Sequence, residues 1–179
     1  MSPRLDPQRL PSHVNRLYRA AWALCGSPHE AEDLVQETFV RVLARPRQLS
    51  GDDELAYLMR VLRNTFLDSR RTASRRPQVA ATLDDLELAD ERSRDRPEDA
   101  LEAQELYSAI AKLPEDFRLA LVAVDIVGLS YGEAGKALNA REATITTRIH
   151  RARRRVVADI DGEGGEAERE GSAPGRRLD

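Results

Sequence analysis

The sequence predicts an all-α protein in which two small helical domains are joined by a flexible acidic linker, and the second domain carries a helix-turn-helix. Three observations support this fold class. Apolar residues recur at helical spacing in two blocks of the chain, and neither block has a convincing strand pattern. A segment with few large apolar residues separates the blocks. The second block ends with a short helix, a tight turn and a longer basic helix.

The distribution of charge along the chain marks the same divisions. Residues 1–76 carry 13 basic and nine acidic residues, whereas residues 77–105 carry three and ten. Residues 106–160 carry nine and six, and residues 161–179 carry three and six. The net charges are therefore +4, −7, +3 and −3, in line with −3 for the whole chain. We predict domains at residues 10–76 and 101–160, a linker at residues 77–100 and a disordered tail at residues 161–179.

The composition excludes several classes of protein. Cys25 is the only cysteine, which excludes a disulfide framework, and its place on an apolar helical stripe predicts a buried inert thiol. No apolar run reaches the roughly 18 residues of a membrane span, and the N-terminus has no apolar signal-peptide core. The three histidines are dispersed, and no phosphate-binding glycine loop is present. We expect a cytoplasmic protein that is not an enzyme, without cofactor, metal, small-molecule substrate or membrane insertion.

The first block begins with two predicted helices. One follows an apolar stripe along residues 14–25 and ends at Gly26. Ser27 and Glu30 then form the pattern of a capping box, which begins the second helix. This second helix is expected to bury apolar residues as far as Leu43.

The other face of the second helix is acidic and polar, and it carries Glu32, Asp33, Gln36 and Glu37. Asp33 and Glu37 are like charges four residues apart, which costs an isolated helix roughly a few tenths of a kcal/mol. Arg41 can pair with Glu37 but leaves Asp33 unpaired. The pattern fits either a surface that docks on a partner protein or an ordinary solvated helix face.

A third helix is predicted over residues 53–71, with Leu58, Leu62 and Phe66 on its core stripe. A group of basic, amide and aromatic side chains lies off that stripe: Tyr57, Arg60, Arg63, Asn64, Arg70 and Arg71. Arginine supplies sequence-independent affinity for phosphate, and tyrosine can stack on an unpaired base. Arginine-rich helix faces are common, however, so this group alone indicates nucleic-acid binding only moderately.

The second block has the order of elements that is typical of a helix-turn-helix. A helix begins after Pro114 and ends at Gly128. A capping-box pattern at Ser130 begins a short helix that ends before Asn139, a residue that tolerates the left-handed conformation of a tight turn. The final helix is predicted over residues 141–158.

The final helix is amphipathic, with Ile145 and Ile149 facing inward. The opposite face carries Thr147, His150, Arg151 and Arg154. A recognition helix presents such side chains to base edges and phosphates. The same pattern also fits a plain amphipathic helix at the end of a bundle.

With both blocks considered, the chain resembles the extracytoplasmic-function (ECF) sigma factors of the bacterial sigma-70 family. The first block carries the resemblance in LYRAAWALCGSPHEAEDLVQETFVRVL (residues 17–43) and AYLMRVLRNTFLDSRR (residues 56–71). The second carries it in LPEDFRLALVAVDIVGLSYGEAGKAL (residues 113–138) and ATITTRIHRARRR (residues 143–155). Two such stretches in order are far more specific than either one alone.

The resemblance implies a role for each surface. The acidic face around Asp33 would dock on the clamp helices of the RNA polymerase β′ subunit, within a core enzyme whose β subunit is a further partner. The third helix would open and read the −10 promoter element through Tyr57, Arg60, Arg63, Asn64, Arg70 and Arg71, with Asn64 aligned to a position that selects a flipped base. The final helix would read the −35 element through Arg141, Thr144, Thr146, Thr147, Arg148, His150, Arg151 and Arg154. An anti-sigma factor is the implied inhibitor.

The sequence departs from the family pattern at four positions. Tyr57 stands where the family usually has tryptophan, and Ala134 and Gly135 stand where it usually has isoleucine and alanine. Gly135 is expected to loosen its helix by up to about 1 kcal/mol. Arg141 occupies the position of a serine or threonine cap and could instead contact phosphate.

Three functions fit the sequence. The favoured one is an ECF sigma factor that binds core RNA polymerase and directs promoter recognition, DNA melting and transcription initiation. The alternatives are a stand-alone helix-turn-helix regulator of transcription and a sigma-like decoy that binds only an anti-sigma factor. Because the linker is long, we expect the two domains to move relative to each other in the free chain.

Overall fold

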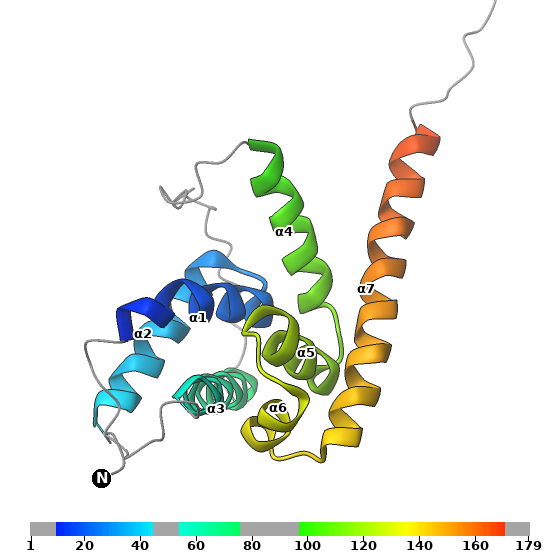
Figure 1. Ribbon diagram of the computed structural model, residues 1–179. Helices are drawn as coiled ribbons and strands as arrows, with labels where there is room; N and C mark the ends of the chain where they lie inside the picture. Colours follow the sequence, from blue (N-terminus) through cyan, green and yellow to red (C-terminus); the bar gives the residue numbers. More distant parts are fainter. Residues whose placement is uncertain (1–9, 45–53, 76–96, 171–179) are drawn as a thin grey trace, which may run out of the picture.

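A computed structural model of the chain describes residues 10–44, 54–75 and 97–170 (Figure 1). All regular secondary structure in these ranges is helical, which confirms the predicted all-α fold class. The elements are α1 (Leu10–Cys25), α2 (Pro28–Ala44), α3 (Glu54–Arg75), α4 (Pro97–Ala111), α5 (Glu115–Leu121), the π-helical segment η2 (Val122–Ile126), α6 (Tyr131–Leu138) and α7 (Glu142–Glu170). Among the described helices, none is both long and apolar enough to cross a membrane.

The first three helices pack through the apolar stripes that the sequence predicts. Leu17 and Leu24 of α1 are fully buried, as are Leu58 and Leu62 of α3. Leu43 is an exception, because its side chain is 53% exposed at the C-terminal end of α2. The prediction that Leu43 is buried is therefore wrong, because Leu43 lies on the outer face of α2, one position after the fully buried Val42.

The helix predicted between Pro114 and Gly128 changes its hydrogen-bonding pattern halfway along. The Val127 amide donates to the Val122 carbonyl at 2.9 Å, a bond across five residues rather than four. Gly128 then ends the segment with φ at +86°, a conformation that glycine adopts without strain. Apolar spacing predicts the helix here but not its π-helical second half.

The helix-turn-helix of α6 and α7 is present as predicted. Ser130 and Glu133 form a complete capping box at the start of α6, and Asn139 has the left-handed φ of 54°. A Cβ atom on Gly135 would lie 2.8 Å from the carbonyl oxygen of Ala140, so the missing side chain allows the turn to fold closely onto α6. Gly135 is thus required by the turn, contrary to the expectation that it only loosens the helix.

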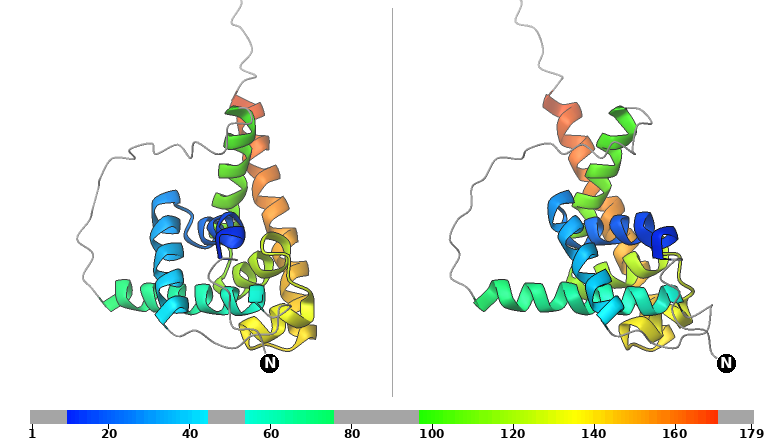
Figure 2. Two further views of the ribbon diagram at one scale, coloured as in Figure 1. Left: turned by 60° about the vertical axis from the view of Figure 1, so that its left-hand side comes forward. Right: turned by 90° about the vertical axis from the view of Figure 1, so that its left-hand side faces the viewer.

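The two halves of the chain pack against each other, with α1 against α4 and η2, and α3 against α6 (Figure 2). Buried residues of both halves form one continuous hydrophobic cluster. In this arrangement, α1 and α4 present apolar side chains such as Trp22 and Tyr107 to each other. The expectation that the two domains move relative to each other in the free chain stays a prediction.

The boundaries of the predicted segments differ at two places. Most of the predicted linker lies outside the described residues, but its last four residues begin α4 at Pro97. The predicted disordered tail is contradicted over residues 161–170, because α7 continues to Glu170. Extending an existing helix adds a hydrogen bond per residue without a new nucleation step, which allows α7 to pass through its glycines. Residues 171–179 lie outside the described part of the chain.

Candidate protein- and nucleic-acid-binding surfaces

The polar face of α2 is exposed along its length. Glu32, Asp33, Gln36 and Glu37 are all accessible to solvent. Glu37 accepts a bond from Arg41 at 2.8 Å, as predicted, and Arg41 also bonds Asp68 of α3 at 2.8 Å. Asp33 lies 3.9 Å from His29, a contact that the sequence analysis missed and that is an ion pair only when the imidazole is protonated. α2 therefore presents a surface of carboxylates and an amide.

Two large apolar side chains continue this surface toward the C-terminal end of α2. Val40 is 61% exposed and Leu43 is 53% exposed. Val40 comes four residues after Gln36, and Leu43 comes seven residues after Gln36. The three side chains therefore lie on one face of the helix. Isolated exposed apolar residues are ordinary, whereas this pair lies directly beside the acidic face of α2. The sequence alone could have indicated this apolar pair, because Val40 and Leu43 are spaced to share a helix face with Gln36.

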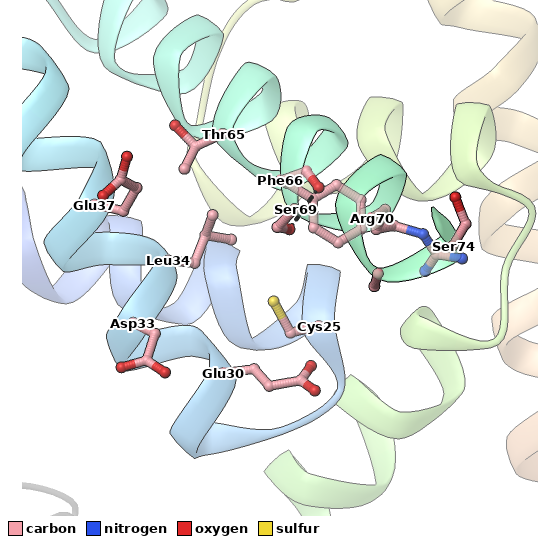
Figure 3. Close-up of a pocket in the computed structure, with 11 residues that line it drawn as sticks. Cys25, Glu30, Asp33, Leu34, Glu37, Thr65, Phe66, Ser69, Arg70 and Ser74 are labelled. Carbon is pink, nitrogen blue, oxygen red and sulfur yellow. Dashed lines mark hydrogen bonds between the residues drawn. The ribbon is translucent and has the colours of Figure 1, made fainter. Parts of the chain in front are cut away.

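A groove with a volume of about 800 Å³ lies between α2 and the C-terminal half of α3 (Figure 3). Its α2 side carries Glu30, Asp33 and Glu37, and Arg70 lines it from α3. Figure 3 shows the sulfur of Cys25 pointing into the space between these helices. Burial raises the pKa of the Cys25 thiol from 9.0 to about 12, and the charge of Glu30 adds to this effect. The thiol is therefore protonated at neutral pH, as expected of an inert cysteine.

The side chains predicted to contact the −10 element lie along α3 in different surroundings. Tyr57 and Arg63 are half-buried, whereas Asn64, Arg70 and Arg71 are exposed. The guanidinium of Arg63 donates to the side-chain oxygen of Asn64 at 3.3 Å, which places these two predicted contacts together.

Three arginines of this set also have partners. Arg70 lies over the Phe66 ring at 5.7 Å, and Arg71 lies 4.0 Å from Asp68. Arg60 donates to the Lys136 carbonyl of α6 at 3.1 Å, so one predicted DNA contact is bound to the other half of the chain.

The outward face of α7 carries most of the side chains predicted for the −35 element. Arg141, Thr144, Thr146, Thr147, His150, Arg151 and Arg154 are exposed. The hydroxyls of Thr146 and Thr147 donate to the carbonyls of Glu142 and Ala143 at 3.0 and 3.1 Å, so each hydroxyl hydrogen is engaged within the helix. The Arg141 carbonyl accepts the first helical bonds, so this residue takes the N-cap position with its side chain exposed.

Arg148 is turned away from the other residues of this set. Its guanidinium donates to Asp116 of α5 at 2.7 Å, and its side chain is only 24% exposed. Arg153 binds Asp125 of η2 through two bonds, at 2.9 and 2.6 Å. These pairs attach α7 to the preceding helices, and they leave His150, Arg151 and Arg154 on the outer face. Within the described ranges, no group of three or more metal-binding side chains is present.

The sequence is similar to two protein families and to several characterised proteins. The profile of Sigma-70 region 2 matches residues 11–76, and that of Sigma-70 region 4 matches residues 103–156. The ECF RNA polymerase sigma factor SigE of Mycolicibacterium smegmatis is 36% identical over 146 residues, which are 80% of this chain and 57% of that protein. The chain thus spans little more than half of SigE. The ECF RNA polymerase sigma factor EcfG of Rhodopseudomonas palustris is 34% identical over 154 residues, which are 86% of this chain and 83% of that protein.

Two solved structures have a similar fold. One is the sigma factor RpoE of Bartonella quintana in complex with the anti-sigma factor NepR, with a TM-score of 0.63 and 24% identity over 86% of this chain and 95% of that chain. The other is CnrH in complex with the cytosolic domain of CnrY, with a TM-score of 0.59 and 25% identity over 87% of this chain and 86% of that chain. With both regions matched in order on one helical fold, the chain belongs to the ECF sigma factors of the sigma-70 family.

Proposed function

We propose that this chain is a promoter-recognition subunit that binds core RNA polymerase and directs transcription initiation at −35 and −10 elements. One observation carries the proposal. The chain exposes an acidic face on α2 and a basic, threonine-containing face on α7, and these two separate faces suit a protein partner and DNA respectively. A regulator that acts alone on DNA needs only the second surface.

The α2 face is the proposed docking site for the clamp helices of the β′ subunit. Its exposed carboxylates at Asp33 and Glu37 attract a basic partner, and Val40 and Leu43 add apolar area beside them. Polar and apolar side chains together on one helix face suit a partner that is itself a helix.

The α3 face is the proposed binding site for the melted −10 element. Arg63, Arg70 and Arg71 supply phosphate affinity, and Tyr57 offers an aromatic ring for stacking. The contact between Arg63 and Asn64 orients the amide that we propose selects a flipped base.

The outer face of α7 is the proposed reader of the −35 element in the major groove. His150, Arg151 and Arg154 can reach bases and phosphates, and the threonine methyl groups can contact thymine. Arg148 is left out of this proposed surface, because its guanidinium is bound to Asp116.

We further propose that the chain acts in the cytoplasm, that polymerase supplies the catalysis, and that an anti-sigma factor restrains it. The similarity to CnrH in its complex with CnrY supports the last point.

Run-off transcription with core RNA polymerase from the source organism tests the proposal, with the DNA upstream of the chain's own gene as template. We expect promoter-specific transcripts only when the chain is added. Core binding is measured on the same samples, because binding without a transcript would favour a decoy. DNA binding without any polymerase binding would favour the stand-alone regulator and contradict the proposal.

A further inference from the structure

The π-helical segment η2 continues the helix that packs against α7. α5 lies beside α7 and runs directly into η2 (Figure 1). Two side chains of this continuous helix contact arginines of α7. The guanidinium of Arg155 lies over the Phe117 ring, 4.9 Å from its centroid. The carboxylate of Asp125 accepts two bonds from Arg153, at 2.9 and 2.6 Å. Phe117 and Asp125 therefore share the face that α5 and η2 present to α7.

The π-helical turn explains how these two side chains come to share a face. In an uninterrupted α-helix, residues seven positions apart lie on one face, so Val124 would take the place that follows Phe117. Asp125 comes eight positions after Phe117. A π-helical turn closes over five residues instead of four, as in the bond from the Val127 amide to the Val122 carbonyl, and so it adds one residue. This added residue brings Asp125 to the face that contacts α7.

Two ion pairs of α7 lie on opposite edges of its buried stripe. Ile149 and Ala152 are buried on that stripe. Arg148 comes one position before Ile149, and Arg153 comes one position after Ala152. Because each residue turns an α-helix by about 100°, the two arginines flank the stripe. Arg148 makes one bond with its partner on α5, at 2.7 Å, whereas Arg153 makes two bonds with Asp125. The pair with two bonds is the stronger restraint on rotation of α7 about its axis.

The rotation of α7 determines where its outer side chains reach. Arg151 and Arg154 are exposed on the outer face. A rotation of about 20° moves a side chain at the roughly 5–6 Å radius of a helix by about 2 Å. Hydrogen bonds form only within a range of about 0.5 Å, so this movement breaks a contact with a base edge. General attraction to phosphates tolerates the same movement. A restraint on rotation therefore acts on sequence preference more than on overall affinity for DNA.

We propose that Asp125 is a positioning residue for −35 recognition, which the π-helical turn directs toward α7 so that its bonds to Arg153 fix the rotation of this helix. The proposal rests on the proposed function, because it takes the outer face of α7 as the −35 reader. Asp125 acts through Arg153 and does not itself contact DNA. The two side chains are 31% and 52% exposed, so their pair contributes little to stability. Effects on sequence preference and on folding can therefore be measured separately.

The test uses the full chain in complex with core RNA polymerase. Asp125→Asn keeps the shape of the side chain and removes its charge, and Asp116→Asn makes the same change at the partner of Arg148. The probe is the promoter fragment upstream of the chain's own gene, with the −35 region randomised. DNA bound by each holoenzyme is sequenced, and its affinity for the original fragment is measured. Urea unfolding of each free chain reports stability.

We expect Asp125→Asn to reduce the preference for the selected −35 sequence over the random pool about tenfold, which is within the range of one good base contact. Asp116→Asn should keep the preference of the parent. Asp125→Glu, which retains the charge, should also keep it. Arg153→Gln should lose preference as Asp125→Asn does. The combination of Arg153→Gln with Asp125→Asn should lose no more than either change alone, because the two side chains act as one pair.

Arg153→Gln gives the same test if Asp125→Asn does not fold. Unchanged preference in a folded variant that lacks the pair would overturn the positioning role. An equal loss of affinity for all sequences, together with a lower free energy of unfolding, would show a structural role alone and would also overturn it. Absence of any selected −35 sequence for the parent holoenzyme would instead contradict the proposed DNA surface of α7, and this proposal with it.

Discussion

At the scale of single residues, Arg148 and Arg151 lie three positions apart on α7 and have different surroundings. Arg151 is exposed on the outer face, whereas Arg148 is bound to Asp116 at 2.7 Å. We predict that Arg151→Ala weakens transcription from promoters that depend on a −35 element. The expected loss is about 1–3 kcal/mol if Arg151 makes a good base contact. Transcription from promoters with substituted −35 sequences is the measurement.

Arg148→Ala is the matched control for Arg151→Ala. Its ion pair lies near the surface, so its loss should lower the free energy of unfolding by at most about 1 kcal/mol. Discrimination between promoter sequences should be unchanged. If Arg148→Ala altered the preferred −35 sequence and Arg151→Ala did not, the assignment of α7 side chains would be reversed. Equal loss for Arg151→Ala on all promoters would indicate a phosphate contact.

Gly135 shows why residue type alone is an incomplete guide to stability. Helix propensity predicts that Gly135→Ala stabilises α6 by up to about 1 kcal/mol. The structure predicts the opposite, because the new Cβ would lie 2.8 Å from the Ala140 carbonyl oxygen. We expect Gly135→Ala to lower the free energy of unfolding by about 1–3 kcal/mol in urea denaturation.

Gly162→Ala is the control for Gly135→Ala, because Gly162 is also helical but has no atom within 4 Å of an added Cβ. It should stabilise the chain by about 0.5–1 kcal/mol. The same sign for both variants would contradict the close approach of the turn to α6. Sequence reasoning singled out Gly135 correctly but could not give its role, since the approaching carbonyl belongs to a turn whose path the sequence does not specify.

At the scale of elements, the start of α6 is stabilised by a reciprocal cap. The Ser130 amide and hydroxyl both donate to the Glu133 carboxylate at 2.7 Å, and the Glu133 amide donates to the Ser130 hydroxyl at 3.3 Å. At the start of α2, the Glu30 amide reaches the Ser27 hydroxyl only at 3.5 Å. We predict that Ser130→Ala costs about 1 kcal/mol of unfolding free energy, and that Ser27→Ala costs less. Thermal unfolding of both variants is the measurement, and equal losses of stability in the two variants would contradict the prediction.

The cap on α6 also predicts a dependence on pH. The bonds from Ser130 lower the pKa of Glu133 below its ordinary value of 4.5. The folded carboxyl group therefore holds its proton less tightly than the unfolded one, so its contribution is complete above pH 4.5 and is lost as the pH falls through the lowered pKa. The difference in stability between the parent and Ser130→Ala should accordingly shrink in acid.

The existence and order of the helices could be predicted from apolar spacing and caps, because both are local properties of the chain. The π-helical turn at η2 and the continuation of α7 to Glu170 could not. η2 keeps nearly the same apolar pattern as an α-helix, and it differs only in which carbonyls its amides reach. The extension of α7 follows from a helix already formed by residues 142–160 rather than from the composition of the tail.

At the scale of the whole molecule, the packing of the two halves could not be predicted from the sequence. Its contacts join residues far apart, such as Arg60 with Lys136 and Arg118 with Leu24, and no motif marks them in advance. The separate character of the α2 and α7 surfaces could be predicted, because each depends on the spacing of charged residues within one helix. Whether both surfaces are exposed depends instead on how the two halves of the chain pack against each other.

The last prediction concerns the surface that joins this molecule to its proposed partner. Asp33→Arg together with Glu37→Arg replaces two carboxylates on the exposed face of α2, so it should abolish binding to core RNA polymerase while the helical signal is retained. Arg41 loses one partner but keeps its 2.8 Å bond to Asp68, which preserves the attachment of α2 to α3. Binding is measured by native gel shift and by fluorescence anisotropy of the labelled chain.

A change of net charge alone could weaken binding to a charged partner, so the control must carry the same change at another site. Glu102→Arg together with Glu105→Arg makes the same substitution on exposed positions of α4. Long-range attraction acts mainly on the association rate and is screened by salt, whereas direct contacts act mainly on dissociation. If α2 is the docking face, its variant loses binding at all salt concentrations and the α4 variant binds normally at moderate salt. Equal losses in the two variants, both removed by salt, would instead make the acidic character of the whole molecule responsible and would contradict a specific docking face on α2.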